Sequence, residues 1–203
     1  MGKIFYIMGK SATGKDKIFS LLQEAEGLNL QKLILYTTRP IRKNEQNGKQ
    51  YYFVSETDLE QMTEAGKVIE VRSYHTVHGV WSYFTAYDEQ MNLEKFDYIG
   101  IGTIESYEKL VEYFGTDVLY PIYVEVEDGE RLTRALKREK KQKEPKYEEL
   151  CRRFLADGID FSEENIVKAG IKVRFNNVDL ENCVQEIKAY ISKNIAPMNG
   201  YMI

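Results

Sequence analysis

The sequence is poor in cysteine and has no long apolar run. Its 203 residues include only two cysteines, Cys151 and Cys183, whose separation fits no familiar metal-ligand pair, so they predict no functional site. No segment approaches the roughly 18 consecutive apolar residues that a membrane-spanning helix needs, so we expect no membrane partner. The apolar run at residues 4–8 is also too short for a signal peptide, which favours a cytoplasmic protein.

An excess of positive charge is also absent. The chain has 28 lysines and arginines against 32 aspartates and glutamates, a formal net charge of −4, which argues against a general nucleic-acid binder. Positive charge is instead concentrated between residues 131 and 146, at Arg134, Lys137, Arg138, Lys140, Lys141 and Lys143. Such a cluster forms either a solvated helix face or a surface for several phosphates, and composition alone favours the first.

Short apolar runs alternate with helical patterns along the chain. The main strand candidates are residues 3–8, 32–36, 51–54, 68–71, 96–101, 120–126 and 171–175. The helix candidates are residues 15–25, 56–65, 105–114, 129–141, 147–157 and 180–195. This alternation predicts an α/β protein with a parallel sheet and crossover helices, and the length fits one folding unit.

A glycine-containing loop follows the first apolar run and precedes the first helical pattern. It reads Gly9-Lys10-Ser11-Ala12-Thr13-Gly14-Lys15-Asp16 and matches the spacing G-x-x-x-x-G-K of a phosphate-binding loop. In such loops backbone N–H groups point at phosphate oxygens, and the helix N-terminus and the lysine add positive charge. A chance glycine turn is the alternative, but the position between strand and helix counts against it. We expect residues 9–16 to bind ATP, with Lys15 reaching the terminal phosphates.

Asp16 stands where this motif usually has a serine or threonine that binds Mg²⁺. A carboxylate is also a good ligand for a hard metal ion, so Asp16 is a candidate magnesium ligand, directly or through water. The alternative is that Asp16 only stabilises the first helical turn, where negative charge is favoured. The sequence favours neither. A further negative charge beside a triphosphate makes dependence on Mg²⁺ expected in both cases.

A second anion-binding pattern follows the apolar run at residues 32–36. Arg39 and Arg42 lie three residues apart in a polar loop that continues through Glu45 to Tyr51. Two guanidinium groups and a phenol suit one phosphate group, because arginine donates bidentately and tyrosine adds a hydrogen bond. Taken alone, the pattern is also compatible with scattered surface charges.

Together with the phosphate loop, this segment closely resembles the guanylate kinase family. The matching positions are Thr37-Thr38-Arg39-x-x-Arg42-x-x-Glu45-x-Asn47-Gly48-Lys49-x-Tyr51-x-Phe53-Val54-Ser55. The resemblance continues at Ile69-Glu70, in the basic segment 134–138 with Arg153, and at Asn176-Asn177-x-Asp179-Leu180. It therefore covers nearly the whole chain.

The resemblance implies an architecture and an activity. The architecture is a P-loop core of parallel sheet flanked by helices, made of residues 1–36, 95–130 and 158–203, with two inserts. Residues 37–94 would form a small mixed α/β monophosphate-binding region, and residues 131–157 a helical lid. The activity is ATP-dependent, Mg²⁺-dependent phosphorylation of GMP, a small-molecule substrate.

The resemblance also implies roles for particular residues. The groups at the transferring phosphoryl would be Lys15, Arg42, Arg138 and Arg153, with Arg152 as an alternative to Arg153. ATP would be bound by residues 9–16, Arg134 and Asn176. The acceptor would be bound by Arg39, Arg42, Glu45, Tyr51 and Glu70, with Glu70 accepting hydrogen bonds from the guanine ring. His78, which departs from the family pattern, is a further candidate that could donate to a phosphate; the alternative is a structural or simply exposed histidine. The basic cluster would then bind phosphates rather than only water.

The sequence departs from the family at the guanine end. His78-Gly79-Val80 replaces a usual Tyr-Gly-Ser or Tyr-Gly-Thr, and Leu35 and Tyr36 replace small hydroxyl residues. Gly100 and Gly102 stand where an aspartate-containing motif is usual, so acidic groups for the nucleoside are missing. Lost hydrogen-bond partners weaken discrimination between acceptors.

These departures leave two other hypotheses open. One is an enzyme like the ribose 1,5-bisphosphate phosphokinases, which resemble guanylate kinases and tolerate a Gly-Lys-Asp phosphate loop. The other is a guanylate-kinase-like module that binds phosphoproteins without catalysis. Lys15 and the lid arginines argue against the module, because buried cations without an anion are unfavourable. Asn47-Gly48-Lys49-x-Tyr51 and Glu70 favour a nucleotide acceptor.

Overall fold

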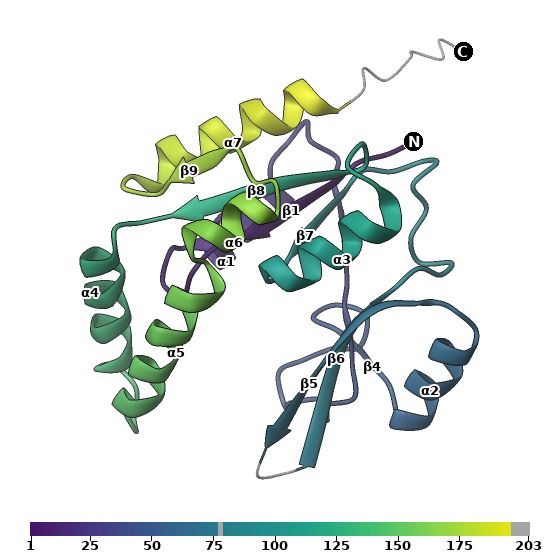
Figure 1. Cartoon of the computed structure of the whole chain (residues 1–203), viewed down its shortest axis with the longest axis horizontal. Helices are drawn as coiled ribbons and strands as arrows, with labels where there is room; N and C mark the ends of the chain where they lie inside the picture. The colour runs from purple at the N-terminus through teal and green to yellow at the C-terminus, as the bar shows by residue number, and fades with distance from the viewer. Residues whose placement is uncertain (77–78, 196–203) are drawn as a thin grey trace.

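The computed structural model describes residues 1–76 and 79–195, and in these ranges the chain forms two β-sheets (Figure 1). The main sheet has five parallel strands in the order β2-β7-β1-β8-β9. Their bounds are β1 Ile4–Met8, β2 Gln31–Lys32, β7 Tyr98–Ile101, β8 Leu119–Glu125 and β9 Arg174–Asn176. The predicted parallel sheet is therefore confirmed.

Strand β1 lies at the centre of this sheet because its side chains are apolar on both faces. All five of its residues are fully buried. Phe5 and Ile7 pack with α1 (Lys15–Gln23) and α7 (Leu180–Asn194) on one face. Ile4, Tyr6 and Met8 pack on the other face with α3 (Ile104–Phe114) and α6 (Glu163–Lys168). The result is a helix–sheet–helix sandwich in which both faces of the parallel sheet are covered.

The second sheet has four strands in the order β4-β3-β6-β5 and lies beside the main sheet (Figure 1). Its strands are β3 Tyr36–Thr37, β4 Tyr52–Phe53, β5 Val68–Thr76 and β6 Gly79–Ala86. Helix α2 (Glu56–Glu64) packs against it, and the expected N-cap, Ser55, forms a capping box with Asp58. This sheet is mixed, since β3 pairs in parallel with β4 but antiparallel with β6.

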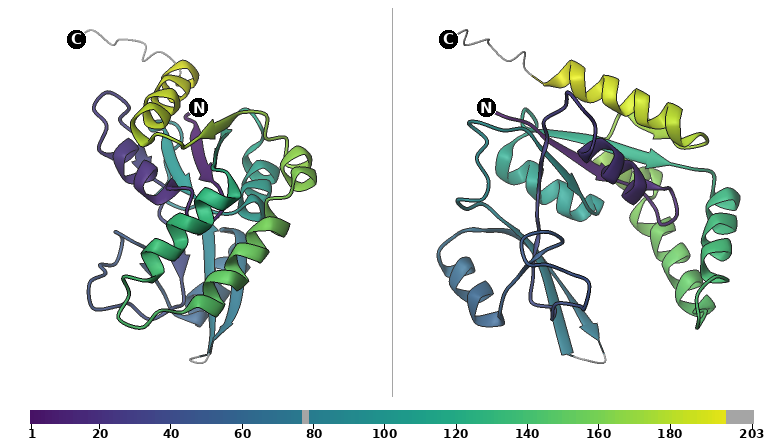
Figure 2. Two further views of the ribbon diagram at one scale, coloured as in Figure 1. Left: turned by 90° about the vertical axis from the view of Figure 1, so that its left-hand side faces the viewer. Right: turned by 180° about the vertical axis from the view of Figure 1, so that it is seen from behind.

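Two helices extend from the end of β8 on the side away from the second sheet. They are α4 (Asp128–Glu139) and α5 (Tyr147–Asp160), which pack against each other (Figure 2). The strand end and both helices therefore meet at the edge of the main sheet where the phosphate loop lies.

The expected strand at residues 32–36 is wrong as a single element. Lys32 ends β2 in the main sheet and Tyr36 begins β3 in the second sheet, so this apolar run crosses from one sheet to the other. Helix α6 was not expected, because only six residues form it. In the part of the chain that the structure describes, no helix has the length and apolar character to cross a bilayer.

Candidate active site

The phosphate loop, residues 9–16, connects the buried end of β1 to the first turn of α1. Gly14 is the N-cap of α1 with φ of 88°, in the left-handed region that favours glycine. Thr13 is buried, and its hydroxyl donates to the Lys10 carbonyl at 2.9 Å. Lys15 is the first helical residue, as the motif requires. The loop therefore presents its backbone and a helix N-terminus to one space.

Asn177 holds this loop from the far end of the chain. Its side-chain amide nitrogen donates to the Thr13 carbonyl at 2.7 Å. A β-carbon on Gly14 would lie 2.5 Å from that nitrogen, so glycine is also needed for this close approach. The Asn177 carbonyl accepts from Arg134 at 3.2 Å. Asn176, the predicted ATP contact, is exposed at the end of β9.

A buried ion-pair cluster joins the loop to α4 and α5. The Asp157 carboxylate accepts from the Ser11 backbone N–H at 2.7 Å and lies 3.3 Å from Arg131. The Arg131 guanidinium is 1% exposed, contacts the Phe154 ring and forms a 3.0 Å ion pair with Asp128. The Asp157–Ser11 contact connects positions 146 residues apart, and no local pattern indicates it.

Lys10 also belongs to this cluster, since its ammonium group lies 3.3 Å from the Asp128 carboxylate. Burial alone would raise the pKa of Asp128, but the charges of Arg131 and Lys10 outweigh it and lower that pKa. The carboxylate therefore stays ionised beside the phosphate loop.

A groove with a volume of about 340 Å³ opens between α1 and the loop that precedes β4. This volume is in the range of ligand sites. Its lining includes Asp16, exposed in the first turn of α1, and Tyr51, from the loop that precedes β4. The groove is therefore shared by the phosphate loop and the two-arginine loop. It is lined by Asp16, Phe19, Ser20, Gln23, Lys32, Leu33, Leu35, Gln50, Tyr51 and Ile101.

Arg39 is held in place by Glu45. The two side chains form a bidentate pair at 2.8 and 3.0 Å, and Arg39 is only 3% exposed. The guanidinium also lies over the rings of Tyr51 and Phe53. The hydrogen bond from Arg39 lowers the pKa of Glu45. Arg42 is exposed, and its backbone N–H donates to Glu45 at 2.8 Å, so one carboxylate organises both arginine positions.

Glu70 is buried on β5 and faces the same side of the second sheet as its cross-strand neighbour Thr85. The Thr85 hydroxyl donates to the carboxylate at 2.7 Å. Arg72, two residues along the strand, donates to it from Nε at 3.0 Å. Sequence reasoning placed Glu70 in the acceptor site but missed Arg72, although an arginine two residues from a glutamate on a strand shares its face.

Tyr6 fills the space beside Gly100 and Gly102. A β-carbon on Gly100 would lie 2.7 Å from the Tyr6 ring, and one on Gly102 would collide with the Tyr6 hydroxyl. That hydroxyl is hydrogen-bonded to Ser106 at 2.8 Å. Burial raises the pKa of Tyr6 to about 12, so the phenol stays neutral. The missing acidic groups are thus replaced by a neutral, buried aromatic side chain.

The two loops and the sheet described above are part of a chain that is matched by known proteins. A model of the family described as guanylate kinase matches residues 1–194. The chain belongs to the guanylate kinase family. Two curated guanylate kinases align with it almost from end to end. The protein from Porphyromonas gingivalis is 29% identical over 203 residues, 97% of this chain and all of that protein. The protein from Mycoplasma mobile is 27% identical, over 96% of this chain and 94% of its own length.

The fold is also similar to that of a solved guanylate kinase. The crystal structure from Anaplasma phagocytophilum superimposes with a TM-score of 0.64 over 97% of this chain and 88% of that one, at 19% sequence identity. The similarity supports the same α/β architecture: a parallel sheet flanked by helices.

The remaining candidate residues of this family member lie on α4 and α5. Arg138 is exposed near the end of α4. Arg153 is half-buried on α5, and its Nε has no hydrogen-bond partner among the described residues. Both arginines pair with Glu149: Arg152 is exposed and lies 2.7 Å from the carboxylate, whereas Arg153 Nε is 3.5 Å from it and so makes the weaker contact. His78 lies outside the described residues.

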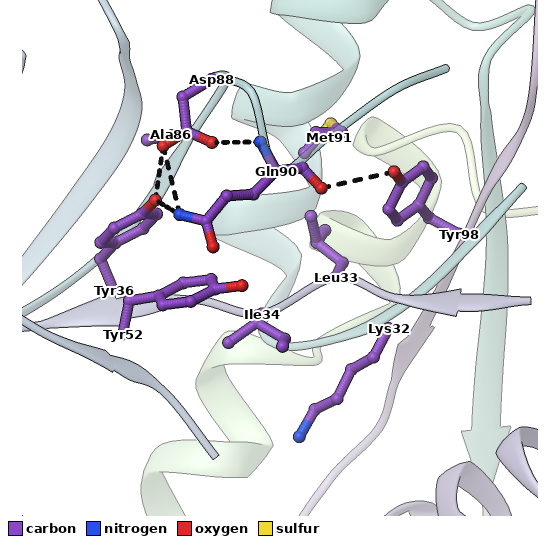
Figure 3. A pocket seen from close by; sticks show the side chains of 10 residues that line it. All are labelled: Lys32, Leu33, Ile34, Tyr36, Tyr52, Ala86, Asp88, Gln90, Met91 and Tyr98. Atoms are coloured by element: carbon purple, nitrogen blue, oxygen red, sulfur yellow. Dashed lines mark hydrogen bonds between the residues drawn. The ribbon is translucent and has the colours of Figure 1, made fainter. Parts of the chain in front are cut away.

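A small pocket marks the point where the chain passes between the two sheets (Figure 3). The Tyr36 hydroxyl donates to Asp88 at 2.5 Å, and Gln90 approaches the same hydroxyl. The cavity measures about 20 Å³, room for one water molecule. It is therefore a junction between the sheets and not a substrate site.

Proposed function

We propose that this protein transfers the γ-phosphoryl group of ATP directly to GMP, giving ADP and GDP. Membership of the guanylate kinase family supports this reaction. The observation in this chain that best supports the proposed reaction is the groove whose lining includes both Asp16 and Tyr51. Phosphoryl transfer asks a protein mainly to align two anions and to neutralise the charge between them. A groove that joins two anion-binding loops meets that need.

On the acceptor side, the two arginines have different environments. Arg42 is exposed and none of the described residues pairs with its guanidinium, whereas Arg39 is held by Glu45 against Tyr51. We assign both arginines and Tyr51 to the GMP phosphate, with Glu45 as the group that positions them. Glu70 is assigned to the guanine ring.

On the donor side, residues 9–16 and Asn176 are assigned to ATP, and Lys15 to its terminal phosphates. Lys15 is half-buried, and none of the described residues pairs with its ammonium group. Arg134, Arg138 and Arg153 lie on α4 and α5, which we assign as the lid, residues 131–157. Closure of these helices would bring cations to the transferring group and exclude water. Residues 37–94 are assigned as the monophosphate-binding region and the rest as the core.

The residues present fit Mg²⁺. In phosphoryl-transfer sites this ion is usually held by one or two carboxylates together with the nucleotide phosphates. Asp16 supplies one exposed carboxylate at the groove, in the first turn of the helix that begins at Lys15. Bound there, Mg²⁺ would offset the charge of the ATP phosphates. We place the reaction in the cytoplasm, between small molecules.

The test is ADP formation from ATP and Mg²⁺ with GMP, dGMP, AMP or ribose 1,5-bisphosphate at equal concentrations. We expect GMP to have the highest kcat/KM. Turnover with the sugar bisphosphate alone would overturn the assignment of the acceptor but keep the phosphate loop. Turnover with none of the four would leave the binding module as the better description. Calcium in place of magnesium is a control for the metal.

A further inference from the structure

The buried carboxylate of Glu70 is already engaged on both oxygens. Arg72 donates from Nε to Oε2 at 3.0 Å and from Nη2 towards Oε1 at 3.4 Å. Thr85 donates to Oε1 at 2.7 Å. The side chains of Glu70 and Arg72 are 3% and 11% exposed. The guanidinium therefore lies beside the carboxylate, with one N–H group directed at each oxygen, which is the bidentate geometry of arginine–carboxylate pairs.

The local strand geometry places the two side chains on one face of the sheet. Glu70 and Arg72 are two residues apart on β5 and project from the same face. Across the ladder they pair with Thr85 and Tyr83 of β6. Burial alone would lower the pKa of Arg72, but the charge of Glu70 outweighs it and raises that pKa. The guanidinium therefore stays charged, and its best partner is Glu70.

Among the described residues, the segment 98–103 at the end of β7 contains no carboxylate that could bind a base beside Glu70. Gly100 and Gly102 carry no side chain, and Tyr6 occupies the space beside them. Glu45, in the loop between β3 and β4, is already paired with Arg39. A guanine ring would therefore depend on Glu70.

Guanine and arginine present the same donor pattern. The ring N1–H and the 2-amino group of guanine form a planar pair of N–H donors like that of a guanidinium, and they need both oxygens of one carboxylate. Arg72 holds that edge of Glu70. Guanine would have to compete with Arg72 for these two oxygens.

We propose that Arg72 is a specificity-determining residue of the acceptor site, which competes with guanine for Glu70. This inference rests on the proposed function, because it takes guanine as the base. Binding of GMP exchanges one pair of N–H donors for another at the same carboxylate. Arg72 thereby weakens GMP binding and reduces the preference for guanine over bases without a 2-amino group.

The experiment compares wild type with Arg72→Met, which keeps the apolar stem and removes the donors. We expect KM for GMP to fall on the order of tenfold, the effect of one charged hydrogen bond, with kcat little changed. The preference for GMP over IMP, which lacks the 2-amino group, should rise. Arg72→Lys, which keeps the charge but not the planar pair, should lie between them and covers the case in which the methionine variant folds poorly.

Calorimetric binding of GMP without ATP separates this inference from the proposed reaction. Higher GMP affinity in the Arg72 variants than in wild type supports the role of Arg72, whether or not the wild type shows turnover. Absence of turnover in the wild type would count against the proposed reaction and not against the role of Arg72. Equal or weaker GMP affinity in both variants overturns the role of Arg72 even if the wild type phosphorylates GMP. Binding of ribose 5-phosphate, which has no base, should not change. Lys109→Met, which removes an exposed ion pair with Glu112, is the control.

Discussion

The side-chain amide of Asn177 donates to the carbonyl of Thr13 at 2.7 Å, across 164 positions of sequence. The residue directly after β9 thus holds the phosphate loop that follows β1. Asn177 is 4% exposed, whereas its neighbour Asn176 is exposed. Adjacent asparagines therefore have different environments, and we expect them to have different roles.

Asn177→Ala should lower stability, because the Thr13 carbonyl loses its buried partner. The expected loss is about 1–3 kcal/mol in the free energy of unfolding. Asn176→Ala should leave stability within about 0.5 kcal/mol and raise KM for ATP. Urea unfolding and initial rates check both variants. A stable Asn177→Ala enzyme with unchanged ATP binding would contradict the role given to this contact.

Lys15→Met should abolish most activity without unfolding the protein. The residue begins α1, and none of the described residues pairs with its ammonium group, so we expect its loss to remove charge stabilisation of the transferring group without unfolding the chain. We expect a fall in kcat of at least about 100-fold. Lys17→Met, an exposed lysine two residues along the same helix, serves as the control and should keep wild-type rates. Comparable rates in the two variants would mean that the phosphate loop is wrongly assigned.

Gly102→Ala should destabilise the protein through Tyr6, because the added methyl group collides with the phenol. We expect a loss of about 1–3 kcal/mol, typical of overpacking. In a Tyr6→Phe background the same change should be less harmful, since the colliding hydroxyl is absent. Thermal or urea unfolding of the two single variants and the double variant gives the coupling energy. Additive losses would show that Tyr6 does not exclude a side chain from this position.

The Arg39–Glu45 pair should make stability depend on pH in the acid range. The pKa of Glu45 is lowered from its ordinary value of 4.5, so the pair stabilises the fold above that value. This contribution is lost as pH falls through the lowered pKa. Glu45→Gln should therefore lose less stability than wild type between about pH 6 and about pH 3.

Glu163→Gln provides the matched comparison for Glu45. Glu163 forms a similar bidentate pair with Arg174 and also has a lowered pKa. Both substitutions should reduce the loss of unfolding free energy, measured with urea, as the pH falls. Only Glu45→Gln should raise KM for the acceptor. Unchanged acceptor KM in Glu45→Gln would remove Glu45 from the site.

Sequence predicts well the parts of this protein whose signals are local. The phosphate loop is a contiguous pattern between one strand and one helix, and Lys15 begins that helix as expected. The two-arginine loop is equally compact, with Arg39, Glu45 and Tyr51 inside thirteen consecutive positions, and these three meet in the structure. The parallel sheet follows from strands with buried faces on both sides.

The parts that sequence misses depend on partners distant in the chain. Nothing in the apolar run at residues 32–36 indicates that it divides between two sheets. The Asp157–Ser11 contact joins positions 146 residues apart. The pairing of Glu70 with Arg72 is local, but its importance depends on Tyr6 and the glycines at the end of β7, which only the fold brings near.

The hydrogen bond between Tyr36 and Asp88 has a topological consequence. It closes the segment 36–88 into a loop whose two ends lie together at the junction of the sheets. The second sheet is an insertion in sequence between β2 and β7. These two strands pair directly with each other in the main sheet. Segments with adjacent ends tolerate exchange. The segment 36–88, to which we assign acceptor binding, is therefore a unit that evolution or design can replace while the main sheet and the loop after β1 are retained.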